Sequence, residues 1–129
     1  MTINFEKPRI LIVDDNFIIR DLIKSFYEEY DFELIEAVNG QEAVDLARAC
    51  KPDLILLDIQ MPFLNGYEAA AILKNDEAVK DIPILIITGQ ERGEVAEQIN
   101  GMYDGYVRKP FKQDDLIKAT KQCLPGIIN

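Results

Sequence analysis

Residues 54–62 are Leu54-Ile55-Leu56-Leu57-Asp58-Ile59-Gln60-Met61-Pro62. Four apolar residues that end on a carboxylate, just before a turn with proline, are typical of a strand buried inside a parallel sheet. Three other strand-like runs also end on polar residues: Ile10–Val13 before Asp14 and Asp15, Ile84–Ile87 before Thr88, and Tyr106–Arg108 before Lys109. The carboxyl ends of parallel strands meet at one edge of the sheet, where ligands bind, so we expect these polar side chains to lie together.

Apolar residues at helical spacing fill the segments between these runs, so strands and helices alternate along the chain. The patterns predict strands over Arg9–Val13, Glu33–Ala37, Asp53–Leu57, Ile82–Thr88 and Gly105–Arg108. They predict helices over Phe17–Tyr30, Gln41–Cys50, Tyr67–Lys74, Glu91–Asn100 and Gln113–Leu124. Asn65 is expected to cap the third helix, and Asn39-Gly40 to form a turn. Right-handed crossovers then give an α/β fold whose parallel sheet is covered on both faces, with the charged strand Glu33–Ala37 at an edge.

The composition is that of a folded protein of moderate size. The 129 residues, 48% of them hydrophobic, indicate a single domain over residues 1–129, with its core over about residues 8–124 and no output domain. The net charge of −9 argues against binding to nucleic acids or anionic membranes. No signal peptide and no apolar run of ~18 residues is present, so we expect a cytoplasmic protein.

Cysteine and histidine usage limits the chemistry. Cys50 and Cys123 have no paired or metal-type spacing, which indicates two free thiols in a reducing compartment. The chain contains no histidine, which excludes a histidine base, a histidine metal ligand and an internal phosphohistidine. If a phosphoryl group reaches Asp58 from a histidine, that histidine belongs to another protein or domain.

Asp14, Asp15 and Asp58 would form a cluster of carboxylates at the predicted sheet edge. Like charges this close repel and need a cation, and oxygen ligands with room for water and phosphate favour Mg²⁺. The pair Asp14-Asp15 has a simpler alternative when taken alone, because Asp15 or Asn16 could cap the helix that follows. Asp58 and Lys109 make the metal and phosphate interpretation the better one.

These residues resemble the motifs of a known family, the response-regulator receiver domain of two-component signalling. The matching pieces are Asp14-Asp15, Asp58–Pro62 with Gly66, Thr88-Gly89 and Gly105–Phe111. The resemblance covers about Pro8 to Leu124. It implies a flavodoxin-like, doubly wound (βα)5 fold with five parallel strands in the order 2-1-3-4-5. It leaves open a stand-alone regulator of the chemotaxis type, a phosphorelay receiver and a fragment of a hybrid kinase.

The resemblance also implies roles for the polar residues. Asp58 would be the phospho-acceptor and form an aspartyl phosphate. Asp15, Asp58 and the backbone carbonyl of Gln60 would bind Mg²⁺ directly, and Asp14 through a water molecule. Lys109 would help Mg²⁺ to spread the charge of the transferring phosphoryl group.

Two further residues would turn phosphorylation into a signal. Thr88 would give its hydroxyl to a phosphate oxygen, and Tyr106 would then rotate from an exposed to a buried position. The surface that changes would comprise the fourth helix, the fifth strand and the last helix. The Lys109–Pro110 peptide bond is expected to be cis, as in the family.

The function implied is a signalling switch that catalyses only its own phosphorylation and dephosphorylation. Its partners would be a histidine kinase or histidine phosphotransfer protein and a downstream protein that the sequence does not identify. A Mg²⁺-dependent phosphatase with an aspartyl nucleophile is one alternative, although Gln60 stands where such enzymes place a second aspartate. A scaffold that is never phosphorylated is another, against which the complete Asp/Thr/Lys set argues. An FMN protein shares the architecture, but no phosphate-cradling loop follows the first strand.

Some positions depart from the family pattern or have simpler explanations. Met102-Tyr103 stands where the family usually has small residues, which puts the geometry around the fifth strand in question. Gln60 and Gln90 flank the expected phosphate site and could orient or block the attacking water. Tyr67 is interpreted as a packing residue.

Overall fold

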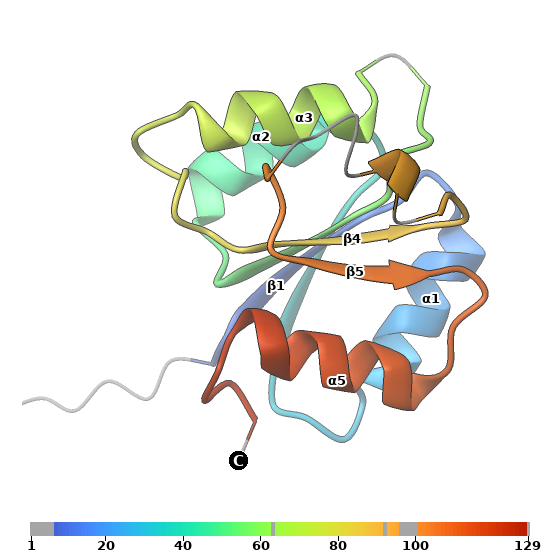
Figure 1. Cartoon of the computed structure of the whole chain (residues 1–129). Coiled ribbons are helices and arrows are strands. Elements are labelled where there is room, and N and C mark those ends of the chain that lie inside the picture. Colours follow the sequence, from blue (N-terminus) through green and yellow to red (C-terminus); the bar gives the residue numbers. More distant parts are fainter. Residues whose placement is uncertain (1–6, 63, 92, 96–100, 129) are drawn as a thin grey trace, which may run out of the picture.

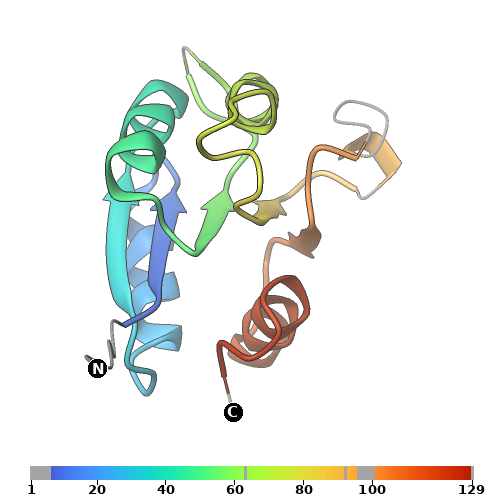
Figure 2. The same ribbon diagram turned by 90° about the vertical axis from the view of Figure 1, so that its left-hand side faces the viewer.

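Five parallel strands form one sheet with helices on both faces. The computed structural model describes residues 7–62, 64–91, 93–95 and 101–128. The strands are β1 (Arg9–Val13), β2 (Glu33–Ala37), β3 (Leu54–Leu57), β4 (Ile84–Thr88) and β5 (Gly105–Arg108), and the labelled helices are α1 (Phe17–Phe26), α2 (Gly40–Cys50), α3 (Gly66–Lys74) and α5 (Gln113–Cys123). The sheet order is β2-β1-β3-β4-β5 (Figures 1 and 2). The predicted fold and strand order are confirmed.

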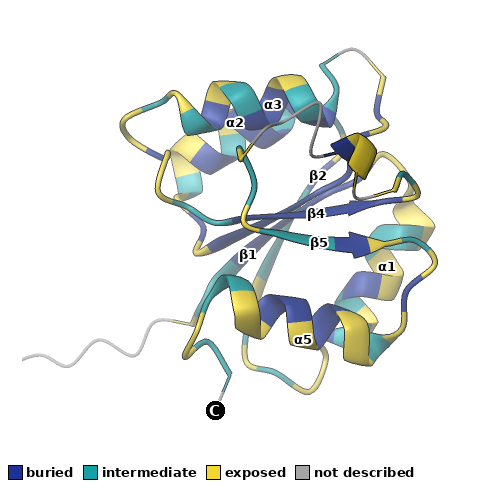
Figure 3. Cartoon of the chain, in the orientation of Figure 1, coloured by how far each residue is buried: buried dark blue, intermediate teal, exposed yellow. Residues whose placement is uncertain are grey.

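Two hydrophobic clusters form the core, one on each face of the sheet. Successive side chains of a strand point to opposite faces. Leu11 and Val13 of β1 accordingly join the cluster under α2 and α3, whereas Ile10 and Ile12 join the cluster over α1 and α5. Figure 1 shows these two pairs of helices on opposite faces of the sheet. Every residue of β3 and β4 is buried, which explains why these strands are apolar except for Thr88 at the end of β4 (Figure 3).

The edge position predicted for Glu33–Ala37 is also confirmed. This segment is β2, and four of its five residues are exposed or half-buried. Among the residues that the structure describes, it pairs along one side only, with β1, from Arg9 opposite Glu33 to Val13 opposite Ala37. The charged residues of β2 therefore keep contact with water.

The ends of the helices are set by capping residues rather than by the spacing of apolar residues. Asn16 caps α1 by accepting a hydrogen bond from the Ile18 amide, and α1 ends at Phe26 rather than Tyr30. Asn65 caps α3 as predicted, in a reciprocal capping box with Glu68.

The turn predicted at Asn39-Gly40 is wrong, because Asn39 is the N-cap of α2 and Gly40 is its first residue. A Cβ atom at Gly40 would lie 2.2 Å from the Leu64 carbonyl oxygen, so the contact between α2 and the loop before α3 requires glycine.

The predicted fourth helix, Glu91–Asn100, lies partly outside the described residues, since 92 and 96–100 are not described; residues 93–95 are helical. Cys50 and Cys123 are free thiols, as expected. In the part of the chain that the structure describes, no helix has both the length and the apolar character needed to cross a membrane.

Candidate functional site

The sheet holds the site residues through backbone hydrogen bonds that continue past the strand ends. The Asp14 amide donates to the Ala37 carbonyl, the Asp58 amide to the Val13 carbonyl, and the Lys109 amide to the Thr88 carbonyl, at 2.8–3.1 Å. Asp14, Asp58 and Lys109 therefore follow β1, β3 and β5 in register, at the same edge of the sheet where Thr88 ends β4. This is the edge that the sequence predicted.

Three carboxylates converge at this edge. Asp14, Asp15 and Asp58 can each offer an oxygen such that all three oxygens lie within 4.8 Å of one another. Asp14 and Asp58 are only 1% and 4% exposed, whereas Asp15 is open to solvent. Burial removes the water that would otherwise screen the repulsion between these carboxylates.

The Lys109 ammonium group lies between two of the carboxylates. Its Nζ atom is 2.9 Å from Asp14 Oδ2 and 3.7 Å from Asp58 Oδ2, so its direct hydrogen bond goes to Asp14. Asp14 Oδ1 accepts a second hydrogen bond from the Asn16 amide at 2.9 Å. When all three carboxylates are ionised, one ammonium leaves the cluster with a net charge of −2.

The pKa of Asp58 records this imbalance. The pKa is raised to about 6, mainly by burial and then by the Asp14 charge, with a smaller contribution from Asp15. The Lys109 ammonium and the Gln60 amide, 3.3 Å from Asp58 Oδ1, oppose the rise without cancelling it. The folded protein therefore destabilises the ionised form of Asp58, and a nearby cation would offset this effect.

The donor set fits a small, hard divalent cation. It consists of carboxylate oxygens, it carries the charge that a divalent ion would balance, and one of its members faces solvent. These are the properties of a Mg²⁺ site that keeps several waters. Gln60 lies beside the cluster through its hydrogen bond to Asp58, and the predicted role of its carbonyl stays a prediction.

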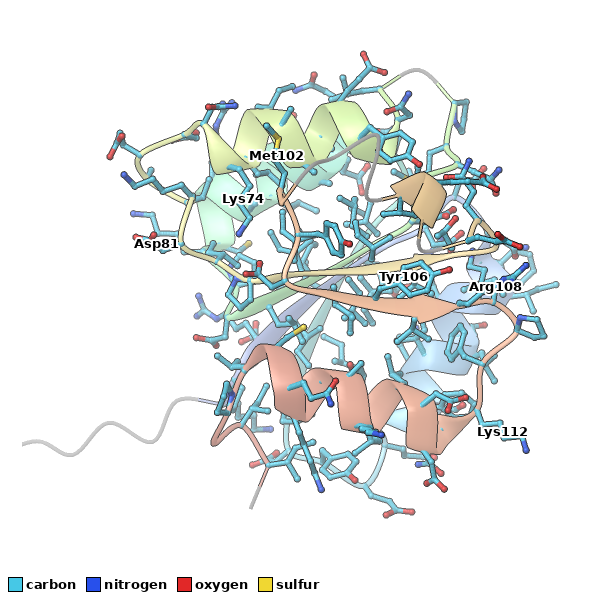
Figure 4. All side chains as sticks on the ribbon, viewed as in Figure 1. Lys74, Asp81, Met102, Tyr106, Arg108 and Lys112 are labelled. Atoms are coloured by element: carbon cyan, nitrogen blue, oxygen red, sulfur yellow. The ribbon has the colours of Figure 1, made fainter. Side chains whose placement is uncertain are left out.

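Thr88, Gln90 and two tyrosines form a second group next to the carboxylates. The buried Thr88 hydroxyl accepts a hydrogen bond from the Gln90 amide at 3.3 Å. The half-buried Tyr106, which lies along β5 (Figure 4), donates its hydroxyl to the Gln90 carbonyl. Tyr67 packs against the core cluster under α2 and α3, as predicted, and also donates its hydroxyl to Gln90 Oε1 at 2.5 Å.

Two contacts support the site from outside the carboxylate cluster. One nitrogen of the Arg20 guanidinium donates to the Asp14 carbonyl at 2.7 Å and another to Glu36 Oε1 at 2.9 Å, which braces the loop between β1 and α1. Gly66 lies against the backbone of Asp58, because a Cβ atom there would be 2.3 Å from the Asp58 carbonyl oxygen. The sequence analysis missed the Arg20 contact, for which the available signal was an arginine one turn into the helix that follows Asp14, whereas it named Gly66 among the matching motifs without this packing role.

The unusual pair Met102-Tyr103 does not disturb β5. Both side chains are half-buried against the core cluster under α2 and α3, and Figure 4 shows Met102 beside α3. Lys74 of α3 forms an ion pair of 2.9 Å with Asp104, which immediately precedes β5. β5 itself stays in register with β4, from Leu85 opposite Gly105 to Thr88 opposite Arg108.

Comparison with known proteins agrees with this geometry. The family model of the response regulator receiver domain matches residues 10–121. PilH of Pseudomonas aeruginosa is 38% identical over 120 residues, which cover 92% of this chain and 98% of PilH. The polar-differentiation response regulator DivK of Brucella anthropi is 35% identical over 116 residues, covering 89% of this chain and 94% of DivK.

Longer relatives match over part of their length. The phosphate regulon regulator PhoB of Pseudomonas aeruginosa is 42% identical over 118 residues, which are 89% of this chain and 51% of PhoB. The chain thus spans about half the length of PhoB, and about half that of the Synechocystis regulator RpaA.

Solved structures show the same fold. The chemotaxis protein CheY4 of Vibrio cholerae superposes with a TM-score of 0.85 at 27% identity, covering 92% of this chain and 100% of CheY4. The receiver domain of a sensor histidine kinase from Pseudomonas aeruginosa, solved with a magnesium ion coordinated in its active site cleft, gives a TM-score of 0.83 at 25% identity, over 92% of this chain and 98% of that one. The chain belongs to the response regulator receiver domain family and is a receiver domain of two-component signalling.

Proposed function

We propose that this receiver domain is a phosphorylation-activated switch in which Asp58 accepts a phosphoryl group from a histidine of a kinase or phosphotransfer protein. The observation that carries the proposal is the burial of the Asp58 carboxylate at the end of β3, beside Asp14, Asp15 and Lys109. Three carboxylates placed this close repel one another, so a purely structural role would not account for their arrangement.

The chemistry would be a nucleophilic substitution at phosphorus. An oxygen of Asp58 bonds to the phosphorus atom while the bond between phosphorus and the donor nitrogen breaks, and the electron pair of that bond leaves with the imidazole. With a pKa of about 6, Asp58 is mostly ionised at neutral pH and can act as the nucleophile. Lys109, 3.7 Å from Asp58 Oδ2, is within reach of a phosphoryl oxygen after a small movement.

Asp14, Asp15 and Asp58 would hold Mg²⁺, with the Gln60 carbonyl as a further ligand. The ion would supply positive charge to the oxygens of the transferring group. Support comes from the all-oxygen donor set and its net charge, and from the magnesium ion in the related receiver domain.

Phosphorylation would be transmitted through Thr88 and Tyr106. The Thr88 hydroxyl already contacts the Gln90 amide, and the Tyr106 hydroxyl contacts the Gln90 carbonyl. Movement of Thr88 toward a phosphoryl oxygen would therefore alter the loop that holds Tyr106. The resulting change in the surface of β5 and α5 would be what a downstream protein detects.

The donor would dock as a protein, because the chain has no histidine of its own. Phe17 and Ile18 of α1 are 63% and 62% exposed, and Leu22 is on the same helix and also exposed. These apolar side chains begin two residues after Asp15 and would give a protein donor a contact surface next to the site.

The test is intact mass spectrometry after incubation with acetyl phosphate and Mg²⁺. We expect a single added phosphoryl group, ~80 Da, in the wild-type protein and in Asp81→Asn. Asp81 is the matched control because it is an exposed aspartate away from this edge of the sheet, before β4 (Figure 4). The adduct should be absent from Asp58→Asn and from a sample with EDTA.

Three outcomes would contradict the proposal. An adduct that persists in Asp58→Asn would place the phosphoryl group elsewhere. Steady release of inorganic phosphate with no change of the Tyr106 environment in a beryllofluoride complex would favour a phosphatase. No adduct and no release, with either acetyl phosphate or a phosphorylated histidine protein as donor, would favour a scaffold.

A further inference from the structure

Gln90 is held from three sides at the mouth of the site. Its amide donates to the Thr88 hydroxyl at 3.3 Å, and its carbonyl accepts from the Tyr106 hydroxyl. Its side-chain oxygen, Oε1, accepts from the Tyr67 hydroxyl at 2.5 Å. The first two contacts fix the backbone of the loop, whereas the third fixes only the direction of the carboxamide.

The direction of this carboxamide matters because of what it can do near a phosphoryl group. A glutamine side chain beside a phosphate can orient the water that attacks phosphorus, as it does in GTPases. The oxygen that would accept a hydrogen bond from that water is the atom to which Tyr67 donates. Tyr67 and an attacking water therefore compete for the position of Oε1.

The backbone around Tyr67 is fixed by several contacts, which keep its hydroxyl beside the Gln90 carboxamide. It follows Gly66, whose amide donates to the Ile59 carbonyl at 3.0 Å and whose Cα lies against the Asp58 backbone. The capping box of Asn65 and Glu68 fixes the same turn of α3. Burial raises the pKa of Tyr67, and the Glu94 charge adds to the rise, so its hydroxyl stays a donor at neutral pH.

We propose that Tyr67 is a positioning residue that lengthens the lifetime of the phosphoryl group on Asp58. Its hydrogen bond would hold the Gln90 carboxamide against α3, turned away from the attacking water. The inference rests on the proposed function. The step that Tyr67 slows is hydrolysis: a water oxygen bonds to phosphorus, the bond between phosphorus and the Asp58 oxygen breaks, and the electron pair stays on the carboxylate. The water proton passes to the released phosphate or to solvent.

The experiment measures the loss of the adduct with time. Wild type, Tyr67→Phe, Gln90→Ala and the double variant are phosphorylated with acetyl phosphate, moved into buffer with Mg²⁺ but no donor, and followed by intact mass. Tyr67→Phe should shorten the lifetime roughly two- to tenfold, the rate equivalent of one hydrogen bond. The double variant should have the same lifetime as Gln90→Ala, because without the Gln90 carboxamide the loss of the Tyr67 hydroxyl releases nothing.

Tyr30→Phe is the matched control, since Tyr30 stacks on Phe32 beyond the end of α1 and is not part of the site. Its lifetime should equal that of wild type. The inference is overturned if Tyr67→Phe does not shorten the lifetime, or if the shortening is as large in the Gln90→Ala background. The absence of any adduct and of any phosphate release on the wild-type protein, with both acetyl phosphate and a phosphorylated histidine protein as donors, would overturn the proposed function and this inference together. An adduct whose lifetime is unchanged in Tyr67→Phe would overturn only the inference.

Discussion

Asp58 has to be ionised to react, yet its surroundings favour the neutral acid. The pKa of a buried carboxyl rises because the charged form loses its hydration, and Asp14 adds repulsion. Lys109 offsets only part of this, because its shorter contact is with Asp14. The ionised form of Asp58 is thus destabilised by its surroundings, and a bound cation would stabilise it.

The raised pKa of Asp58 predicts how the stability of the folded protein depends on pH. The pKa of Asp58 is raised from 3.8 to about 6 in the folded protein, so folding favours the protonated form. The charged form destabilises the fold above pH 6, and the penalty disappears as the pH falls below about 4. Asp58→Asn should therefore stabilise the metal-free protein by about 1–3 kcal/mol at pH 7.5, and the gain should shrink toward zero near pH 4.

Urea unfolding in EDTA at several pH values measures this difference. Asp81→Asn is the control, because that aspartate is exposed and lies at the opposite edge of the sheet. A gain for Asp58→Asn that stayed constant with pH would show that the effect is not the charge of Asp58.

The sequence was enough to predict which residues meet at this edge, because strand ends in a parallel sheet are forced together. It could not predict that Lys109 pairs more closely with Asp14 than with Asp58, or that Tyr67 reaches Gln90. Differences of about one ångström between long side chains decide these contacts, and no spacing along the chain encodes them.

At the scale of elements, glycines determine how closely α2 and α3 approach the site. The start of α3 lies against the backbone of Asp58 and Ile59, with no room for a Cβ atom at Gly66. The start of α2 meets the loop before α3 in the same way, at Gly40. The two helices on this face are therefore located by backbone contacts as well as by their apolar sides.

Gly66→Ala tests this packing. The added Cβ atom would be 2.3 Å from the Asp58 carbonyl oxygen, and the backbone must move to relieve the clash. We expect a loss of about 1–3 kcal/mol in the free energy of unfolding, measured in urea, with slower phosphorylation of Asp58. Gly93→Ala is the control, because nothing lies within 4 Å of its Cβ position and alanine is the better helix residue. Equal stability of the two variants would rule out the proposed packing constraint.

The helices and strands themselves were largely predictable, whereas their ends were less so. The predicted first helix runs to Tyr30, but α1 ends at Phe26. The pattern reports burial, and Tyr27 is buried without being helical. β4 starts at Ile84 rather than Ile82, because Pro83 has no amide to give to the sheet. Burial and backbone conformation are separate properties, and periodicity detects only the first.

At the scale of the whole molecule, the two helices on each face of the sheet contact each other, and on one face a buried hydrogen bond adds to that contact. On one face α2 and α3 contact each other directly and share one hydrophobic cluster. On the other face α1, near the start of the chain, is joined to α5, near its end, by a buried hydrogen bond between Tyr27 and Thr120 at 2.7 Å. Thr120 already donates its hydroxyl to the Leu116 carbonyl at 2.7 Å, so Tyr27 is the donor in this contact.

The long separation of Tyr27 and Thr120 is why the sequence did not indicate the link. The two residues are 93 positions apart, in segments whose patterns predict only that both are helical. Tyr27, just after the end of α1, and Thr120 of α5 become partners only once the sheet has set the distance between these two helices. Burial raises the pKa of Tyr27, so the hydroxyl remains protonated and able to donate at any physiological pH.

Tyr27→Phe removes this hydrogen bond while keeping the ring, which packs edge-on against Phe32. We expect the free energy of unfolding to fall by about 1–2 kcal/mol, the net worth of a buried hydrogen bond. The measurement is urea unfolding of Tyr27→Phe, Thr120→Val and the double variant, with Tyr30→Phe as the control for loss of a tyrosine hydroxyl. If the bond joins the two helices, the double variant will be less destabilised than the sum of the single variants. Strictly additive losses would show that Tyr27 and Thr120 contribute independently, and that packing alone holds α1 and α5 together.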